Sequence, residues 1–281
     1  MPALGPAAVA REQTFAANRA TGHIALSVIA TRGLSRRARV HEAGSLRVRF
    51  PNGQSDGALD AVIVNTAGGM TGGDRFDLDF EVGSGARLSA TTAAAEKVYR
   101  SLGPDTTVCV RLTIGDGAAL AWLPQETILF DRVRLRRTID IELAGEAHLL
   151  LAETLVFGRS AMGEIVSVGH LFDRWRVRLD GELIFAETVR LDGAIAEQLA
   201  RRPAAAGGAA IAGILKIPGD EEAVAAVRAM QQNFAGDVGV SAWNGLALAR
   251  LVAPDGAALR RDLVAIVSAW SATPLPRLWL N

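Results

Sequence analysis

The stretch that decides the fold is NTAGGMTGGDRFDLDF, which runs from Asn65 to Phe80. It holds four glycines in six positions and leads from an apolar run, 59–65, into alternating apolar and acidic residues. That alternation, over 76–82, places apolar side chains on one face of a strand and acidic side chains on the other. The glycines therefore join strand to strand, and we interpret the loop as a structural crossing or a contact surface rather than a ligand loop.

Several common chemistries find no support in the residue types. The glycine loop does not open a helix and is not followed by a Lys-Ser or Lys-Thr pair, so it is not a Walker-type phosphate loop. The chain has no GxSxG motif and no paired cysteines or histidines at metal-ligand spacing. Its isolated histidines are His23, His41, His148 and His170. The sequence therefore gives no sign of an NTPase, a serine hydrolase or a His/Cys metal site.

The bulk composition indicates a neutral protein with an aliphatic core. The 281 residues are 49% hydrophobic but only 5% aromatic, and 30 basic residues balance 30 acidic ones. This balance argues against nucleic acid or an anionic membrane as a partner. All basic residues except Lys97 and Lys216 are arginines, which suit protein interfaces, although a GC-rich genome also explains this bias.

Cys109, the only cysteine, excludes an intramolecular disulfide and is predicted to be a buried small hydrophobe. We see no secretory signal and no membrane-length apolar run, so we expect a soluble cytoplasmic protein.

Short alternating or apolar runs bounded by Gly, Asp, Asn and Pro recur along the chain and predict strands. Asp180-Gly181 and Asn244-Gly245 are typical of hairpin turns. The predicted strands cover 23–31, 45–50, 61–65, 76–82, 86–92, 107–114, 119–124, 133–143, 147–157, 165–179 and 182–191, with a hairpin over 239–252.

Two helices are predicted near the C-terminus. One covers 220–234 with Asp220 as N-cap and a stripe that includes Val224 and Val227. The other covers about 257–270. Its buried face is predicted to contain Leu259, Leu263, Ile266 and Trp270, and its solvated face Arg260, Arg261 and Asp262.

The fold class that follows is all-β: an irregular multi-strand β-sandwich or β-rich body with two short C-terminal α-helices. We expect one domain over residues 1–281, a flexible N-terminus over 1–20 and a flexible loop over 201–210.

Three carboxylates stand out as functional candidates. Glu126 and Asp131 flank a block rich in apolar and basic residues, and Glu153 interrupts the apolar strand LLLAETLVF. A charge inside such a strand is costly unless it is paired or hydrated. Each carboxylate is therefore either ion-paired with an arginine, such as Arg100, Arg132 or Arg159, or lines a polar cavity. Two carboxylates, Glu126 and Glu153, would also suit a glycosidase at the right separation.

Two segments are candidate partner-binding surfaces. In DRVRLRR, Arg132, Arg134 and Arg136 alternate with apolar residues, which indicates either a solvated strand face or a docking strip for an acidic surface. In TTAAAEKVYRS, Tyr99 and Arg100 are typical of an interface anchor, although a buried, hydrogen-bonded tyrosine fits equally well.

These blocks together resemble the urease accessory protein D (UreD/UreH) family. The glycine loop is similar to that family's NPPGG…GGD loop, with Ala67 where proline is common and Met70-Thr71 where Leu-Val is more usual. TTAAAEKVYRS, WLPQETILFDRVRLRR, AETLVFGRSAMGE and the ending PLPRLWLN resemble further blocks of the family, in the family's order, from about residue 23 to residue 279.

The resemblance implies a non-enzymatic scaffold with no tightly bound cofactor and an irregular all-β body carrying two helices. Such proteins act with the helical accessory protein UreF and the GTPase UreG on apo-urease, so that nickel is inserted. An internal, water-filled nickel passage is proposed for the family. If it exists here, its candidates are Asp74, Glu126, Asp131 and Glu153, because hard oxygen donors pass a divalent ion without trapping it.

Two other classes of function are kept as alternatives. One is a β-rich glycoside hydrolase that uses Glu126 and Glu153, and the missing nucleophile weighs against it. The other is a carbohydrate-binding module, disfavoured by the single tyrosine, Tyr99, and the low aromatic content, since sugars stack on aromatic rings.

Overall fold

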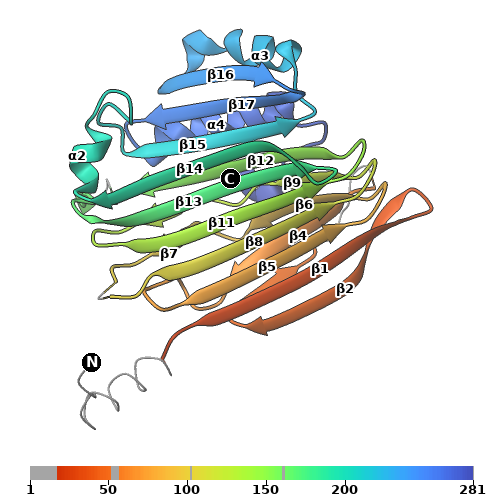
Figure 1. Ribbon diagram of the computed structural model, residues 1–281, viewed down its shortest axis with the longest axis horizontal. Helices are drawn as coiled ribbons and strands as arrows, with labels where there is room; N and C mark the ends of the chain where they lie inside the picture. The colour runs from red at the N-terminus through yellow and green to blue at the C-terminus, as the bar shows by residue number, and fades with distance from the viewer. Residues whose placement is uncertain (1–17, 52–56, 102, 160–161, 281) are drawn as a thin grey trace.

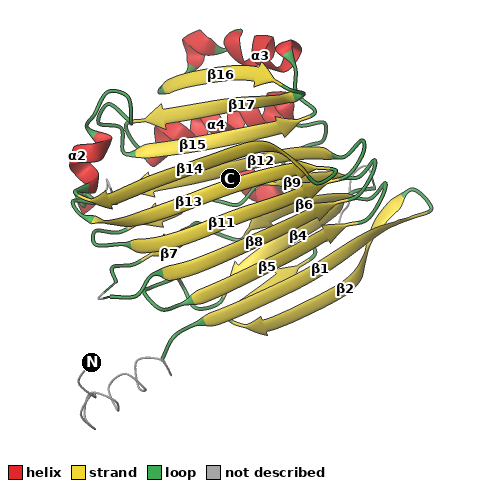
Figure 2. Cartoon of the chain, viewed as in Figure 1, coloured by secondary structure: helices red, strands yellow, loops and turns green. Residues whose placement is uncertain are grey.

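A computed structural model of the chain describes residues 18–51, 57–101, 103–159 and 162–280. The described part is a β-sandwich with helices against its outside, as Figures 1 and 2 show. The all-β fold with C-terminal helices is therefore confirmed. The expected flexibility of the N-terminus concerns mostly residues 1–17, which lie outside the described residues.

The first sheet has seven strands in the order β14-β13-β11-β8-β5-β1-β2. Their bounds are β1 (Thr21–Thr31), β2 (Leu34–Gly44), β5 (Arg75–Val82), β8 (Thr106–Ile114), β11 (Arg134–Leu143), β13 (Gly169–Leu179) and β14 (Glu182–Gly193).

The second sheet has ten strands, eight of them in the order β16-β17-β15-β12-β9-β6-β4-β3, with β10 beside β12 and β7 beside β10. Their bounds are β3 (Leu46–Arg49), β4 (Leu59–Asn65), β6 (Arg87–Thr92), β7 (Glu96–Val98), β9 (Ala119–Trp122), β10 (Thr127–Leu129), β12 (His148–Phe157), β15 (Ala210–Ile217), β16 (Asp237–Trp243) and β17 (Leu246–Ala253).

The chain winds back and forth between the two sheets. From β4 to β13 each visit to the first sheet adds one strand, and each visit to the second adds one strand or, with β7 and β10, two. As a result β5, β8, β11 and β13 are parallel neighbours, as are β4, β6, β9 and β12. The glycine loop is one of these crossings, because it joins β4 of the second sheet to β5 of the first. All loops that pass from the second sheet to the first consequently gather at one end of the sandwich.

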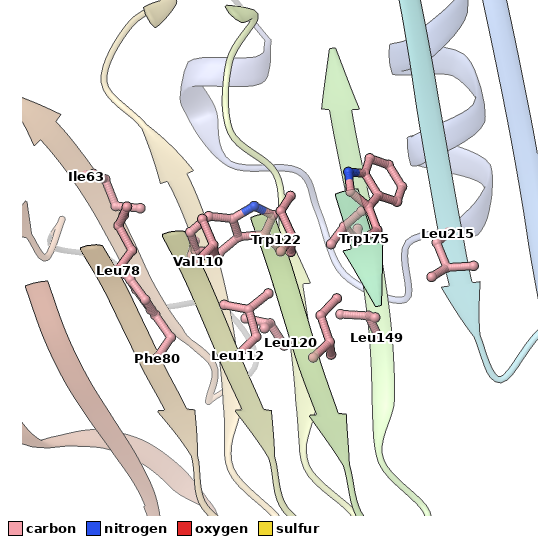
Figure 3. Packing of buried hydrophobic residues seen from close by; sticks show 14 of the residues in the cluster. Ile63, Leu78, Phe80, Val110, Leu112, Leu120, Trp122, Leu149, Trp175 and Leu215 are labelled. Carbon is pink, nitrogen blue, oxygen red and sulfur yellow. The ribbon is translucent and has the colours of Figure 1, made fainter. Parts of the chain in front are cut away.

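The inner faces of the two sheets form the main core, which Figure 3 shows from close by. The residues that face the second sheet include Leu78 and Phe80 of β5 and Leu112 of β8. The rings of Phe80 and Trp122 are packed edge to face, with 5.2 Å between their centroids. Aliphatic side chains fill most of the remaining space. The core is therefore built mainly from Val, Leu and Ile, as the composition indicates.

A second, smaller core lies between the second sheet and the helices α3 (Glu221–Arg228) and α4 (Gly256–Trp270). Asp220 and Asp255 cap these helices by accepting hydrogen bonds from Ala223 N and Ala258 N, at 3.0 and 2.8 Å. The apolar face of α4 is buried as predicted. None of the helices in the described residues is both long and apolar enough to cross a membrane.

The structure corrects several local predictions. Asp262 does not face solvent, because its carboxylate is buried and accepts hydrogen bonds from Ala235 N and Gly236 N. Cys109 is only half-buried, since its phase in β8 places it on the outer face of the first sheet. The sequence did not predict the short helix α2 (Ile195–Leu199), nor the strands β2 and β15.

The backbones of β1 and β2 approach each other closely at Gly44, and substitutions of glycine test this close approach. Its φ is +62°, and a Cβ there would lie 1.8 Å from the carbonyl oxygen of Thr21. Gly33 has a similar φ of +77°, but a Cβ at that position would meet nothing within 4 Å. We expect Gly33→Ala to lower the free energy of unfolding by about 1–2 kcal/mol, the cost of a left-handed alanine. Gly44→Ala should lose more than about 3 kcal/mol, because backbone must move as well.

Urea unfolding of both variants measures the difference. Equal losses in the two would show that the close approach at Thr21 does not constrain the pair.

Candidate functional site

A cluster of buried charges joins the two sheets across the core. Arg137 of β11 donates through Nε and Nη2 to both carboxylate oxygens of Asp173 on β13, at 3.0 and 2.6 Å. Its Nη1 donates to Glu153 of β12, in the opposite sheet, at 2.5 Å. The indole Nε1 of Trp122 donates to the other oxygen of Glu153 at 2.9 Å. All three charged side chains are at most 7% exposed.

The position of each charge follows from strand alternation. Leu135, Arg137 and Ile139 share the inward phase of β11, and Asp173 lies between the inward residues Leu171 and Trp175 of β13. In each strand a charge therefore replaces one of the apolar side chains that line the core.

One arginine faces two carboxylates, so the fully ionised cluster carries one excess negative charge. Burial raises the pKa of Glu153, and the neighbouring Asp173 carboxylate adds to this, against the lowering effect of Arg137 and Trp122. Burial alone would lower the pKa of Arg137, but the two carboxylates outweigh it, and the guanidinium stays charged. The cluster is therefore a place where a proton or a cation is favoured.

Two cavities meet at this cluster, because Arg137 and Glu153 line both of them. The larger, of about 240 Å³, is also lined by Glu187 and Arg250, which form an ion pair at 3.1 Å. Since the Arg250 side chain is 58% exposed, this part of the cavity borders solvent.

The smaller cavity, of about 70 Å³, is lined on its far side by Asn65, Glu96 and Gln125. Glu96 accepts a hydrogen bond from Asn65 Nδ2 at 3.0 Å, and burial raises its pKa. Both residues are partly exposed, so this side also approaches solvent. Polar side chains therefore occur at three places along the two cavities, which are otherwise lined mostly by apolar side chains. They are Asn65 with Glu96, the charge cluster, and Glu187 with Arg250, and we call this series the interior path.

The four carboxylates nominated from the sequence do not lie together. Glu153 is in the buried cluster, where it is both ion-paired and next to a cavity. Its partner is Arg137, not one of the arginines at positions 100, 132 and 159 that a simple pairing would suggest. Glu126 binds Arg260 of α4 at 3.2 Å, on the helix side of the second sheet.

Asp74 and Asp131 hold loops in place. Asp74 is buried and accepts hydrogen bonds from Ala20 N and Thr71 N, at 2.9 and 2.8 Å. Asp131 Oδ1 accepts hydrogen bonds from Ser167 N and Val168 N, at 2.7 and 3.2 Å. Both carboxylates therefore accept hydrogen bonds from backbone N–H groups, and neither lines the two interior cavities.

Sequence reasoning missed Arg137, Asp173, Glu96 and Glu187 as members of this path. A signal exists for Arg137 and Asp173, because each puts a charge in the apolar phase of a strand whose neighbours are core residues. Glu96 and Glu187 carry no such signal, since β7 is too short for a pattern and β14 is largely exposed.

A second feature is the end of the sandwich where the crossing loops gather, which we call the loop pole. It consists of the described residues 66–74, 99–101, 103–105, 130–133, 158–159 and 162–168, which lie between strands of the two sheets. Backbone hydrogen bonds join these loops: Tyr99 N donates to Met70 O, Ser101 N to Arg132 O, and Arg132 N to Val168 O. The motif blocks that are far apart in the sequence are therefore neighbours here.

The glycine loop packs tightly against this pole. A Cβ at Gly69 would lie 2.5 Å from the Tyr99 ring, and one at Gly72 would lie 1.9 Å from Ser101 Oγ. Only glycine allows the loop to lie so close to Lys97, Tyr99, Ser101 and Pro104. This supports the interpretation of the loop as a structural crossing.

The loop pole also exposes apolar and basic side chains. Tyr99 is 38%, Met162 72%, Ile165 67% and Val168 44% exposed. Arg159 stacks over the ring of Phe130, at 4.4 Å from its centroid. Such a mixture of apolar and arginine side chains on one surface is typical of a protein interface.

Of the five partner-binding candidates, three lie at the loop pole and two lie on β11, which leads away from it. Tyr99, Arg100 and Arg132 are exposed on the pole itself. Arg134 pairs with Asp105 at 2.9 Å, and Arg136 stacks over Phe172, so both are engaged on the outer face of the first sheet.

The described residues include no group of three or more His, Cys, Asp or Glu side chains arranged to hold a metal ion. The interior path instead offers single carboxylates, each separated from the next by neutral or basic groups.

The raised pKa of Glu153 leads to a pH-dependent prediction. Because the folded state holds this proton more tightly than the unfolded state, the contribution of Glu153 to stability is greatest at acid pH and is lost as pH rises through its folded pKa. The amide of the Glu153→Gln variant does not titrate. The free energy of unfolding of this variant, relative to the natural protein, should therefore increase from pH 4 to pH 8. Urea unfolding at a series of pH values measures it, and a constant or falling difference contradicts the buried position assigned to this carboxyl group.

Comparison with known proteins agrees with the resemblance seen in the motif blocks. The family model described as UreD urease accessory protein matches residues 20–280. A "Urease accessory protein UreD" of Rhodopseudomonas palustris (strain BisB5) is 54% identical over 98% of this chain and 97% of its own length. The protein of the same name in Bradyrhizobium diazoefficiens (strain USDA 110) is 54% identical over 95% and 96% of the two chains. The chain belongs to the UreD family of urease accessory proteins.

Proposed function

We propose that this protein is a non-catalytic scaffold of urease maturation, which docks on apo-urease together with UreF-type and UreG-type proteins while nickel is inserted. Its membership in the UreD family supports the general role. The observation that carries the more specific proposal is the polar path through the sandwich, whose centre holds one more carboxylate than arginine.

Nickel, as cargo, passes along this path in the proposal. A divalent cation in a low-dielectric interior needs negative charge and oxygen ligands, and Glu153 and Asp173 provide both. Arg137 neutralises one of the two carboxylates, so the cluster attracts a cation without forming a tight chelate. Among the four carboxylates nominated from the sequence, Glu153 remains the candidate for the passage, and Asp173, Glu96 and Glu187 join it.

The alternative as a glycoside hydrolase loses support from the geometry. Glu126 lies on the helix side of the second sheet with Arg260, whereas Glu153 points into the core between the sheets. Two carboxylates on opposite faces of one sheet do not flank a common substrate. A carbohydrate-binding role is also disfavoured, because the exposed large aromatic residues in the described part are Tyr99, at the loop pole, and Trp243, at the end of β16, and these two do not form one aromatic surface.

The passage is tested by co-expressing urease with variants of this protein. Glu153→Gln and Asp173→Asn keep the size of the side chain and remove its charge, so both should lower the nickel bound per urease active site several-fold. The matched control is Glu142→Gln, because Glu142 is also ion-paired, with Arg178 at 3.2 Å, but lies on the outer face of β11. Metal analysis of the purified urease measures the effect.

Copurification of the accessory proteins with urease must be unchanged in these variants. Normal nickel content in both Glu153→Gln and Asp173→Asn would overturn the passage while leaving the scaffold role intact.

The loop pole is the docking face in this proposal. We expect Ile165→Glu to reduce copurification of the UreF-type protein or of apo-urease at least about tenfold, because a charge would be buried in the interface. Leu183→Glu is the matched control, since Leu183 is 49% exposed on β14, away from the pole. Pull-down from cells that co-express all partners measures the loss. Full retention of every partner by Ile165→Glu would show that docking takes place elsewhere.

A further inference from the structure

The β1–β2 hairpin carries the strongest local charge in the chain. Residues 32–49 contain six arginines and one carboxylate, Glu42, although the whole chain is neutral. The arginines are Arg32, Arg36, Arg37, Arg39, Arg47 and Arg49. The single carboxylate does not neutralise them, because Glu42 already binds Arg49 at 3.0 Å and the backbone N–H of Val48 at 2.5 Å.

Four of these arginines have no ionic partner among the residues that the structure describes. No described carboxylate lies within ion-pair distance of Arg32, Arg36, Arg37 or Arg39. The neighbouring Arg37 lies over the ring of Phe50, at 5.1 Å from its centroid. This contrasts with the outer face of the first sheet, where Arg111, Arg134 and Arg178 each pair with a carboxylate.

The strand that carries this charge is also an open edge. β2 is the last strand of the first sheet and, among the described strands, pairs with β1 alone, while Ser35 N near its start donates to Gly57 O at 2.8 Å. Every residue from Arg36 to His41 is exposed, so the strand is solvated on both faces. Figure 1 shows the hairpin extending beyond the rest of the sandwich at its end. Edge strands with unpaired backbone groups are places where another strand adds to a sheet.

Apolar side chains are interleaved with the arginines. Ile29, Leu34 and Val40 are 46%, 41% and 39% exposed. Beside the strand lies a groove of about 590 Å³, lined by Arg37, Ala38, Val40, Glu42, Val48, Arg49 and Phe50. The edge thus offers backbone hydrogen-bonding groups, positive charge and apolar contacts together.

The charge decides which occupant fits. A second copy of the chain would bring its own arginines against Arg36 and Arg39, and like charges at cross-strand distance are destabilising. An extended segment with carboxylates at alternate positions would instead place them next to these arginines. Nucleic acid is disfavoured, because the positive charge is confined to one strand edge of a neutral chain.

We propose that the β2 edge binds an extended, acidic segment of a partner protein, which adds as a further strand to the first sheet. The inference rests on the proposed scaffold role only for the identity of the partner. It concerns a surface separate from the loop pole and from the interior path.

A peptide-binding experiment with the full chain tests the proposal without urease or nickel. The probe is a fluorescent peptide of about ten residues that alternates glutamate and valine, long enough to span the exposed part of β2. The comparison probes are the lysine-valine peptide and a single-stranded oligonucleotide. Fluorescence anisotropy at low salt gives the affinities, and hydrogen exchange of residues 36–41 reports whether the strand edge becomes protected.

Charge reversal provides the matched variants. Arg36→Glu/Arg39→Glu should weaken binding of the glutamate-valine peptide at least about tenfold. Arg201→Glu/Arg202→Glu changes the net charge equally at exposed positions outside the edge, and it should stay within about twofold of the natural protein.

Four results would overturn the proposal: no binding of the glutamate-valine peptide, equal binding by Arg36→Glu/Arg39→Glu, binding without slower exchange in 36–41, or tighter binding of the oligonucleotide. Each result is independent of nickel loading, so failure here leaves the proposed function standing, and failure of nickel transfer leaves this surface standing.

Discussion

The contact of Arg137 with Glu153 and Asp173 is the interaction on which the interior of this protein depends. It joins β11 and β13 of one sheet to β12 of the other through a guanidinium that is almost fully buried. Buried ion pairs seldom add net stability, because the cost of removing the charges from water offsets their attraction. We therefore interpret the cluster as a means of placing polar groups at the centre of the sandwich, between the two cavities, and not as a source of stability.

The winding of the chain explains why distant motif blocks belong together. Each crossing from the second sheet to the first delivers one loop to the same end of the sandwich, and backbone hydrogen bonds join these loops into one surface. The glycines at 69 and 72 are needed because neighbouring crossings leave no room for a side chain. The same arrangement separates the loop pole from the interior cavities, the two regions to which the proposed function assigns partner contacts and passage of nickel.

Much of the fold was predictable, and the failures have physical reasons. Alternation in 76–82 and 107–114 and the caps at Asp220 and Asp255 predicted strands and helices that the structure confirms. β2 has no alternation of apolar and polar residues, because both of its faces are solvated over much of its length. Its arginine-rich sequence therefore gives no strand pattern. Asp262 lies on the polar side of α4 but is buried by the chain that folds over it at Ala235, which is a tertiary contact that no local pattern reveals.

The candidate site was predictable only in part. Glu153 was found because a lone carboxylate in an apolar strand is conspicuous. Its partners Arg137 and Trp122 lie 16 and 31 residues away on other strands and are known only from the packing of the sheets. Three other carboxylates were nominated beside it, but they make different contacts. Glu126 binds Arg260 of α4, and Asp74 and Asp131 accept hydrogen bonds from the backbone of loops.

The central claim is that the polar interior around Glu153 admits a divalent cation. Anomalous diffraction at the nickel edge from crystals soaked in nickel tests it most directly. We expect anomalous density in the cavities beside Glu153 and Asp173, which disappears in the Glu153→Gln protein. Density confined to surface histidines and carboxylates, with none between the sheets, would contradict it.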